Sequence, residues 1–130
     1  MNETVSMLMQ RTVWTIKMDD PVEAIKALFT RERLSWAPVV SEEGVVVGVI
    51  SATDLVRHLE IGKELPRVMA WQLCTYKPIE VAPDTTLKEV AGLMVERKIH
   101  HVVVMEHSKI VGVVSSLDFV RAFIDAGPYR

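Results

Sequence analysis

A ten-residue stretch occurs twice in this chain, and this repeat constrains the fold more than any other feature. Gly48 to Arg57 reads GVISATDLVR and Gly112 to Arg121 reads GVVSSLDFVR, so six of ten positions are identical at an offset of 64 residues. A match of this quality indicates a duplicated structural unit. In a chain of 130 residues, two copies predict a tandem pair of small units, because units of roughly half that length need a shared core to be stable.

Each copy predicts a strand that ends where a helix begins. Val45–Ile50 is an apolar, β-branched run that suits a buried strand. Ser51 and Asp54 then have the spacing of a capping box, in which the hydroxyl satisfies a free N–H of the first helical turn and the carboxylate reaches back. Ser115 and Asp118 repeat the pattern. The same kind of turn can also receive a phosphate at the helix N-terminus, and the local residues leave both interpretations open.

The first repeat predicts the order strand, helix, strand, strand, helix. Residues 12–16 are β-prone and predict a short strand, and Asp20 precedes a proline as the expected capping residue of a helix that runs to about Arg33. A further strand begins near Pro38, where a missing N–H does least harm at the start of a strand. The turn-like residues 41–44 connect it as a hairpin to the strand that precedes Ser51.

The second repeat follows the same order, with Thr86 and Glu89 as the capping box of its first helix and His107–Lys109 as its hairpin turn. The fold class is therefore α/β (α+β), with two β-α-β-β-α repeats. The predicted domain boundaries are 1–62 for repeat 1, 63–70 for a linker and 71–130 for repeat 2.

Composition and charge exclude several classes of function. The hydrophobic content of 49% is high for a small monomer and predicts self-association. The net charge of −2 and the lack of a basic stripe argue against nucleic-acid or anionic-membrane partners. Neither a signal peptide nor a membrane-spanning stretch is recognisable, which predicts a cytoplasmic location. Cys74 is the only cysteine, so an internal disulfide is impossible.

Metal binding and catalysis receive little support. Neighbouring residues on a strand point to opposite faces, so His100 and His101 cannot easily bind one ion. No cysteine or carboxylate stands at ligand spacing beside His100, His101 and His107. No nucleophile is recognisably paired with a base, and Cys74 aligns with the apolar Met9 of the other repeat. We therefore predict no metal, no catalytic cofactor and no enzymatic activity.

The two repeats together resemble a tandem CBS-domain pair, or Bateman module, over essentially the whole chain. The residues that carry the resemblance are 37–40 with 48–54, and 101–104 with 112–118. The resemblance implies two repeats packed with pseudo-twofold symmetry through their sheets, and a homodimer of such pairs. It also implies a regulatory adenosine ligand, namely AMP, ADP, ATP or S-adenosylmethionine, bound in clefts.

By this resemblance, Asp54 and Asp118 would accept hydrogen bonds from ribose hydroxyls, while Ser51 and Ser115 would contact the ribose or the first phosphate. Arg57 and Arg121 lie one turn further along and could meet a phosphate, although solvated helix residues have the same spacing. The remaining implied ligand-binding residues are Thr53, Ser116, Ile16, Lys17, Trp36, Ala37, Pro38, Val81, His101, Val102 and Val103.

Two departures from the family pattern predict unequal sites. Val103 stands where the family often has proline, and Ser116-Leu117 replaces the Ala52-Thr53 of the first copy. The favoured hypothesis is a sensor of cellular adenylates in which ligand shifts the arrangement of the two repeats, and an unidentified effector protein responds. The alternatives are a nucleotide-free dimerisation scaffold and a regulatory domain of a larger enzyme or transporter.

Overall fold

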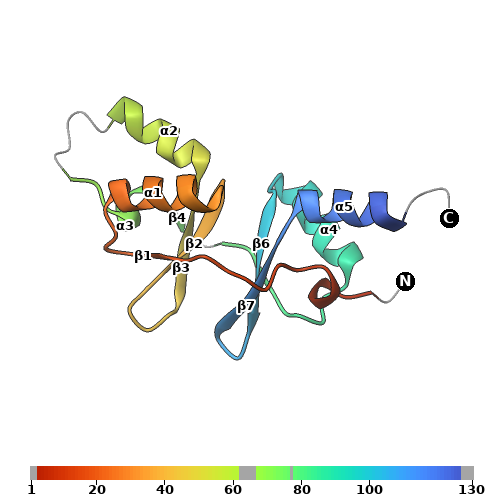
Figure 1. The fold of residues 1–130 in the computed structure, drawn as a ribbon. Helices are drawn as coiled ribbons and strands as arrows, with labels where there is room; N and C mark the ends of the chain where they lie inside the picture. The colour runs from red at the N-terminus through yellow and green to blue at the C-terminus, as the bar shows by residue number, and fades with distance from the viewer. Residues whose placement is uncertain (1–2, 62–66, 77, 127–130) are drawn as a thin grey trace. The chain divides into compact units, whose positions relative to one another are not determined.

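The computed structural model describes residues 3–61, 67–76 and 78–126, and Figure 1 shows their helices and strands. Contacts divide the chain into two compact units: Met1–Val13 with Ile79–Arg130, and Trp14–Pro78. The predicted boundaries 1–62, 63–70 and 71–130 divide the chain by its sequence repeat, whereas the two units divide it by which residues are in contact. Residues 63–66 of the predicted linker lie outside the described part of the chain.

The unit Trp14–Pro78 contains a four-stranded sheet of order β1-β2-β3-β4, in which β1 is parallel to β2 and the other neighbours are antiparallel. Its core holds Ile25 and Phe29 from the first helix and Val39 and Ile50 from the sheet. In chain order its elements are β1 (Ile16–Lys17), α1 (Val22–Glu32), β2 (Trp36–Val40), β3 (Val46–Ser51), α2 (Ala52–Ile61), α3 (Ala70–Leu73) and β4 (Thr75–Tyr76).

The other unit repeats this plan with a three-stranded sheet of order β5-β6-β7. Helices α4 and α5 contact each other and pack on β6 and β7, respectively (Figure 1). Its elements are η1 (Val5–Met7), β5 (Glu80–Val81), α4 (Leu87–Arg97), β6 (His101–Glu106), β7 (Lys109–Ser115) and α5 (Ser116–Ala126). The predicted order strand, helix, strand, strand, helix is thus confirmed in both repeats.

Three local predictions in the first repeat are wrong in detail. The strand expected over residues 12–16 is confined to Ile16–Lys17. Asp20 does not cap α1: Pro21 is the N-cap residue, and the Asp20 carboxylate accepts the N–H of Lys17 instead (2.9 Å). Pro38 lies in the middle of β2 opposite Val49, where it is fully buried.

The predicted turns and the second-repeat cap are present. Residues 41–44 close the first hairpin with Gly44 at a φ of 82°, and His107 and Ser108 close the second with φ values of 51° and 64°. Positive φ at both central residues suits the right-handed twist of a tight hairpin. Thr86 Oγ1 accepts the N–H of Glu89 (3.1 Å), so it caps α4 as predicted.

The segment before the first strand of each repeat lies in the unit formed by the other repeat. We call residues 3–10 and 68–76 the lead-in segments. Thr4 bridges Thr86, and the Leu87 N–H at the start of α4 donates to the Glu3 carbonyl (3.0 Å). In the other unit Pro21 bridges Met69, and the Val22 N–H at the start of α1 donates to the Val68 carbonyl (2.9 Å). Each lead-in thus supplies acceptors to the first helix of the opposite repeat, which explains why α1 needs no aspartate cap.

Both lead-ins then run beside the glycine-containing strand of the unit. Gln10 bridges Val113 of β7, and Thr75 pairs with Val49 of β3. A Cβ added at Gly48 would lie 2.6 Å from the Thr75 carbonyl oxygen, and one added at Gly112 would lie 2.5 Å from the Met9 sulfur. Only glycine at these two positions permits so close an approach of the lead-in.

No helix among the described residues is both long enough and apolar enough to cross a membrane.

We expect Gly48→Ala to destabilise the protein by about 1–3 kcal/mol, because its new methyl group would overlap lead-in backbone that cannot easily move. Gly92→Ala is the matched control: Gly92 is exposed within α4, and a Cβ there meets nothing within 4 Å. Gly92→Ala should stabilise the protein by about 0.5–1 kcal/mol. Urea unfolding monitored by circular dichroism measures both changes, and equal effects of the two substitutions would contradict the close packing of the lead-in.

Candidate functional site

A complete capping box joins β3 to α2. The Asp54 Oδ2 atom accepts the backbone N–H of Ser51 (2.8 Å) and its hydroxyl (3.1 Å), and the Ser51 Oγ accepts the N–H of Asp54 (3.3 Å). The other carboxylate oxygen, Oδ1, faces the guanidinium of Arg57 (3.4 Å). Asp54 is only 5% exposed, and the cap holds its carboxyl group in one orientation at the end of the strand.

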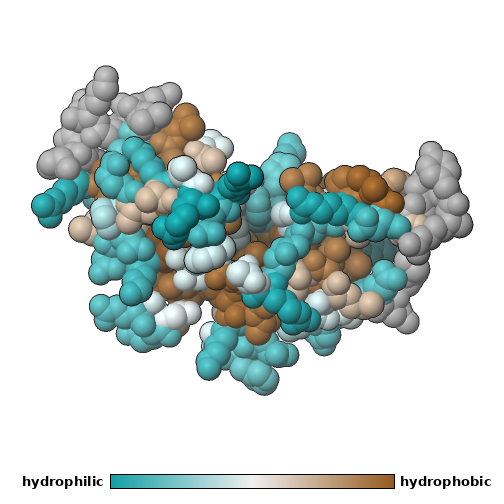
Figure 2. Space-filling view, viewed as in Figure 1, coloured by the Kyte–Doolittle hydropathy of each residue, from teal (hydrophilic) through white to brown (hydrophobic). Residues whose placement is uncertain are grey.

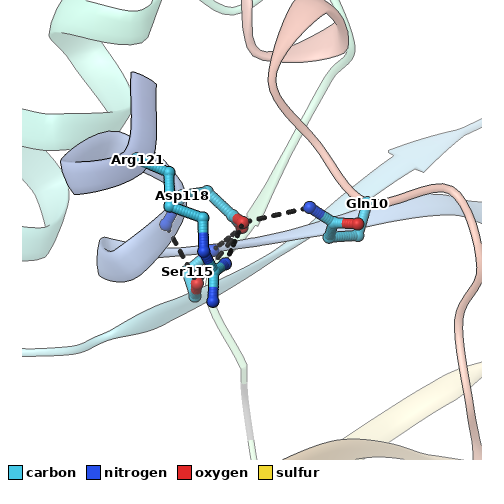
Figure 3. A network of polar contacts seen from close by, with 4 residues as sticks. All are labelled: Gln10, Ser115, Asp118 and Arg121. Atoms are coloured by element: carbon cyan, nitrogen blue, oxygen red, sulfur yellow. Dashed lines mark hydrogen bonds and ion pairs between the residues drawn. The ribbon is translucent and has the colours of Figure 1, made fainter. Parts of the chain in front are cut away.

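The second repeat builds the same box and adds one partner. Ser115 and Asp118 make the equivalent three hydrogen bonds at 2.7, 3.1 and 3.3 Å, and Arg121 lies 3.4 Å from Oδ1 of Asp118. Gln10 of the lead-in also donates its side-chain N–H to this Oδ1 atom (3.1 Å), as Figure 3 shows. Asp118 is 4% exposed, and its Oδ1 therefore has donors from two separate segments of the chain.

Gln10 is a site residue that the sequence interpretation missed. The signal available in the sequence was its alignment with Thr75 at the same offset of 65 that relates the first halves of the two repeats. That alignment places a polar residue before the first strand of each repeat. It does not indicate that Gln10, in the first repeat, reaches the capping box of the second repeat.

Most backbone donors at the two helix starts already have partners. For α2, the N–H groups of Ser51 and Asp54 donate to each other's side chains in the capping box, and the Ala52 N–H donates to the Ser35 carbonyl (2.8 Å). Of these first four N–H groups, that of Thr53 has no partner among the described residues. Both the Thr53 N–H and its exposed hydroxyl can meet a ligand.

The start of α5 differs at two side chains. The Ser116 N–H donates to the His100 carbonyl (2.9 Å), and the Ser116 hydroxyl lies 3.4 Å from the His100 ring nitrogen Nδ1. Leu117 follows where α2 has Thr53, and its side chain is 58% exposed. The two helix starts therefore present different groups.

Trp36 and His101 occupy equivalent positions beside the two boxes, because Trp36 is paired with Ser51 and His101 with Ser115. The next two residues of each strand are fully or almost fully buried, so their side chains belong to the core. These residues are Ala37, Pro38, Val102 and Val103.

Val103 occupies the position that Pro38 has in the first repeat, and it makes a backbone hydrogen bond that proline cannot make. The Val103 N–H donates to the Ile79 carbonyl (3.1 Å) at the start of the parallel strand. Pro38 has no N–H and cannot make the equivalent bond. The carbonyl before β1 therefore receives no N–H from Pro38, whereas the carbonyl before β5 receives the N–H of Val103. The two units thus differ in backbone hydrogen bonding at this point.

Three predicted ligand residues lie away from the capping boxes. Ile16 and Lys17 pair with Val39 and Val40, at the opposite end of β2 from Trp36. The Ile16 side chain is fully buried in the core, and Val81 packs partly buried against the other core. Lys17 lines a hollow of about 320 Å³ with Met18, Asp19 and residues 41–43 of the hairpin.

Burial controls the protonation of two further residues. Desolvation, helped by the neighbouring His100, lowers the pKa of His101 from 6.5 to about 4, and the Asp118 carboxylate only partly opposes this shift. His101 is therefore neutral at pH 7. Desolvation raises the pKa of the Cys74 thiol, which keeps it protonated and makes it a poor nucleophile. Among the described residues, no group of His, Cys, Asp or Glu side chains is arranged to hold a metal.

The comparison with known families agrees with this geometry. The CBS domain model matches residues 5–61 and again residues 70–125. The chain belongs to the CBS domain family and contains two copies of the domain.

Relatives and solved structures extend the comparison. The chain is 33% identical over 107 residues to inosine-5'-monophosphate dehydrogenase of Halobacterium salinarum, and 30% identical over 115 residues to the gamma-3 subunit of 5'-AMP-activated protein kinase of Bos taurus. The matches span 82% and 80% of this chain but only 21% and 22% of those relatives.

Among solved structures, CBSX2 in complex with AMP has a TM-score of 0.83 and 25% identity, covering 95% of this chain and 98% of that one. The CBS domain pair of protein MJ0100, in complex with 5-methylthioadenosine and S-adenosyl-L-methionine, has a TM-score of 0.88 and 22% identity, covering 98% and 100%. These likenesses confirm the CBS-pair fold.

The neutral state of His101 predicts a pH dependence of stability. Its pKa is about 4 in the folded chain against 6.5 for a free histidine side chain, so the unfolded chain binds the proton more readily between these pH values. Stability from this group is therefore lost as the pH falls from about 6.5 to about 4. We expect His101→Gln to flatten the fall in melting temperature over this window.

His107→Gln, in the exposed hairpin turn, is the control and should keep the wild-type profile. Differential scanning calorimetry at half-unit pH steps gives the slopes. A His101→Gln profile parallel to that of the wild type would show that His101 ionises equally well in the folded and unfolded states.

Proposed function

We propose that this CBS pair is a non-catalytic regulatory module that binds an adenosine nucleotide, with AMP as the first ligand to test. The observation that carries the proposal is the pair of nearly buried carboxylates, Asp54 and Asp118, each held by a capping box beside an arginine and a helix start. A capping box alone needs no arginine and no buried charge. A ribose diol next to a phosphate needs acceptors and donors in this arrangement.

The ribose is proposed to bind Oδ1 of the aspartates, because Oδ2 already accepts two hydrogen bonds from the serine. The Ser51 hydroxyl donates to Asp54 and accepts from the Asp54 N–H. It therefore has only one lone pair left, which can accept from a sugar hydroxyl but cannot donate to phosphate while the cap is intact. Ser115 is bound in the same way.

The phosphate is proposed to bind the donors that remain. In the first repeat these are the Thr53 N–H and hydroxyl and the guanidinium of Arg57, which is 58% exposed and uses one N–H on Asp54. In the second repeat Arg121 is 66% exposed and plays the same part, but Leu117 offers only its N–H. The first repeat is thus better supplied for a phosphate.

The base is proposed to lie against the backbone beside the capping box, near Trp36 in one unit and His101 in the other. The AMP complex of CBSX2, at 25% identity, and the likeness to a subunit of an AMP-activated kinase support adenylates. S-adenosylmethionine and ATP stay alternatives for the same pockets. A cellular role in energy sensing follows if AMP competes with ATP.

Regulation is proposed to act through a population shift. A ligand that binds one arrangement of the two repeats better than another must favour that arrangement. An effector protein, or further domains such as those of the longer relatives, would respond to the change.

Self-association is proposed to use the exposed apolar side of α5. Figure 2 shows hydrophobic residues over this helix. Leu117, Val120, Phe123 and Ile124 are between 49% and 66% exposed, and their spacing places them along one side of the helix. A second copy that packs on this side would remove the apolar surface from water.

We expect Asp54→Ala and Asp118→Ala each to reduce the thermal stabilisation by AMP, and the double variant to abolish it, because the ribose loses its acceptor. Each substitution should also cost about 1 kcal/mol of stability through the lost cap. A thermal-shift screen with AMP, ADP, ATP and S-adenosylmethionine, followed by calorimetry, measures both effects.

The control for lost capping is Thr86→Ala, which removes the cap of α4 without touching either proposed site. It should lower the melting temperature by a similar amount and keep the full AMP shift. If well-folded wild-type protein gives no shift with any of these compounds at millimolar concentration, the nucleotide proposal is wrong and the scaffold hypothesis remains.

We expect Phe123→Glu to convert a dimer into a monomer, because it buries a charge in the proposed apolar contact. Phe123 is 64% exposed within the protomer, so the substitution should leave the protomer folded. Light scattering coupled to size exclusion measures the mass, with Thr30→Glu on exposed α1 surface as the charge-matched control. Unchanged mass in Phe123→Glu would exclude this side of α5 as the contact.

A further inference from the structure

We propose that Gln10 makes the Asp118 site the weaker of the two ligand sites, because it competes with the ligand's ribose for one carboxylate oxygen. This inference rests on the proposed nucleotide-binding function and adds a residue that sets the relative affinities. Gln10 acts through Asp118 and is therefore a positioning residue with an inhibitory effect on binding.

The competition follows from counting acceptor positions on Asp118. Each carboxylate oxygen accepts about two hydrogen bonds. Oδ2 has the N–H and the hydroxyl of Ser115, and Oδ1 has Gln10 at 3.1 Å and Arg121 at 3.4 Å. All four positions are thus taken by the residues drawn in Figure 3. A ribose hydroxyl can reach Oδ1 only when Gln10 or Arg121 leaves.

Gln10 is held in place by its backbone. Its N–H donates to the Val113 carbonyl (2.8 Å), and its carbonyl accepts the N–H of Val113 (3.0 Å). A Cβ at the neighbouring Gly112 would lie 3.0 Å from the Gln10 carbonyl oxygen, so the lead-in lies tightly against β7. This fixed backbone aims the amide at Asp118 and keeps its local concentration high.

The other unit provides an internal comparison. Thr75 pairs with Val49 of β3 as Gln10 pairs with Val113 of β7. Thr75 makes no hydrogen bond to Asp54 among the described residues, because its side chain is two heavy atoms shorter along the chain than that of glutamine. The lead-in therefore adds a competing donor at Asp118 and none at Asp54.

The predicted consequence is ordered binding. A nucleotide at Asp54 displaces no lead-in side chain, whereas a nucleotide at Asp118 must displace one of the two donors on Oδ1, Gln10 or Arg121. One exchanged hydrogen bond corresponds to about a three- to tenfold difference in affinity. The Asp54 site should fill first, and Gln10 should be released from Asp118 only at higher ligand concentration.

The test measures each site alone by isothermal titration calorimetry with AMP, with ADP and ATP in parallel. The Asp54→Ala background retains the Asp118 site, and there Gln10→Thr should tighten binding by about three- to tenfold. The Asp118→Ala background retains the Asp54 site, and there Thr75→Gln should weaken binding by a similar factor. Thermal unfolding without ligand confirms that each variant is folded.

The direction of the change separates the possible roles of Gln10. A merely structural residue, or one that contacts the ligand, would weaken binding when replaced, so weaker or unchanged binding in Gln10→Thr overturns the inference and leaves nucleotide binding intact. If neither the wild type nor any variant binds an adenosine nucleotide, the proposed function fails and this inference fails with it.

Discussion

The close packing of each lead-in segment on a glycine-containing strand is the constraint on which the rest of the structure depends. Gly48 and Gly112 leave the space that the lead-in backbone and the side chains of Cys74 and Met9 fill. This contact closes both hydrophobic cores, since Val5 and Met9 belong to one and Ala70 to the other. It also satisfies the first N–H groups of α1 and α4. Neither unit is therefore complete without a segment from the other repeat.

The same packing carries a polar side chain to the capping box. The box itself is a local device that satisfies the helix start and holds a carboxylate nearly buried. Two differences distinguish the boxes: Thr53 against Leu117 within the motif itself, and, from outside it, Gln10 on one lead-in against Thr75 on the other. A duplicated fold can thus hold two sites of unequal chemistry without a change in its backbone plan.

Local patterns predicted the elements well where they depend on neighbouring residues. The hairpins and both Ser-x-x-Asp boxes are as expected, because their hydrogen bonds join residues close together in the sequence and need no distant partner. One error occurs where a distant segment takes the place of a local cap. Asp20 has the right place for a cap, but the Val68 carbonyl already receives the Val22 N–H. Pro38 is tolerated within β2 because the parallel strand beside it begins only opposite Val39.

The sequence by itself determined the duplication, the fold class, the family and the two aspartates, since all of these follow from residues close together or from the 64-residue repeat. Only the tertiary structure decided which lead-in serves which repeat and which donors each oxygen of the two aspartates receives. The Gln10–Asp118 hydrogen bond joins residues 108 positions apart. No local periodicity encodes such a pair, because its formation depends on how the lead-in packs on a distant strand.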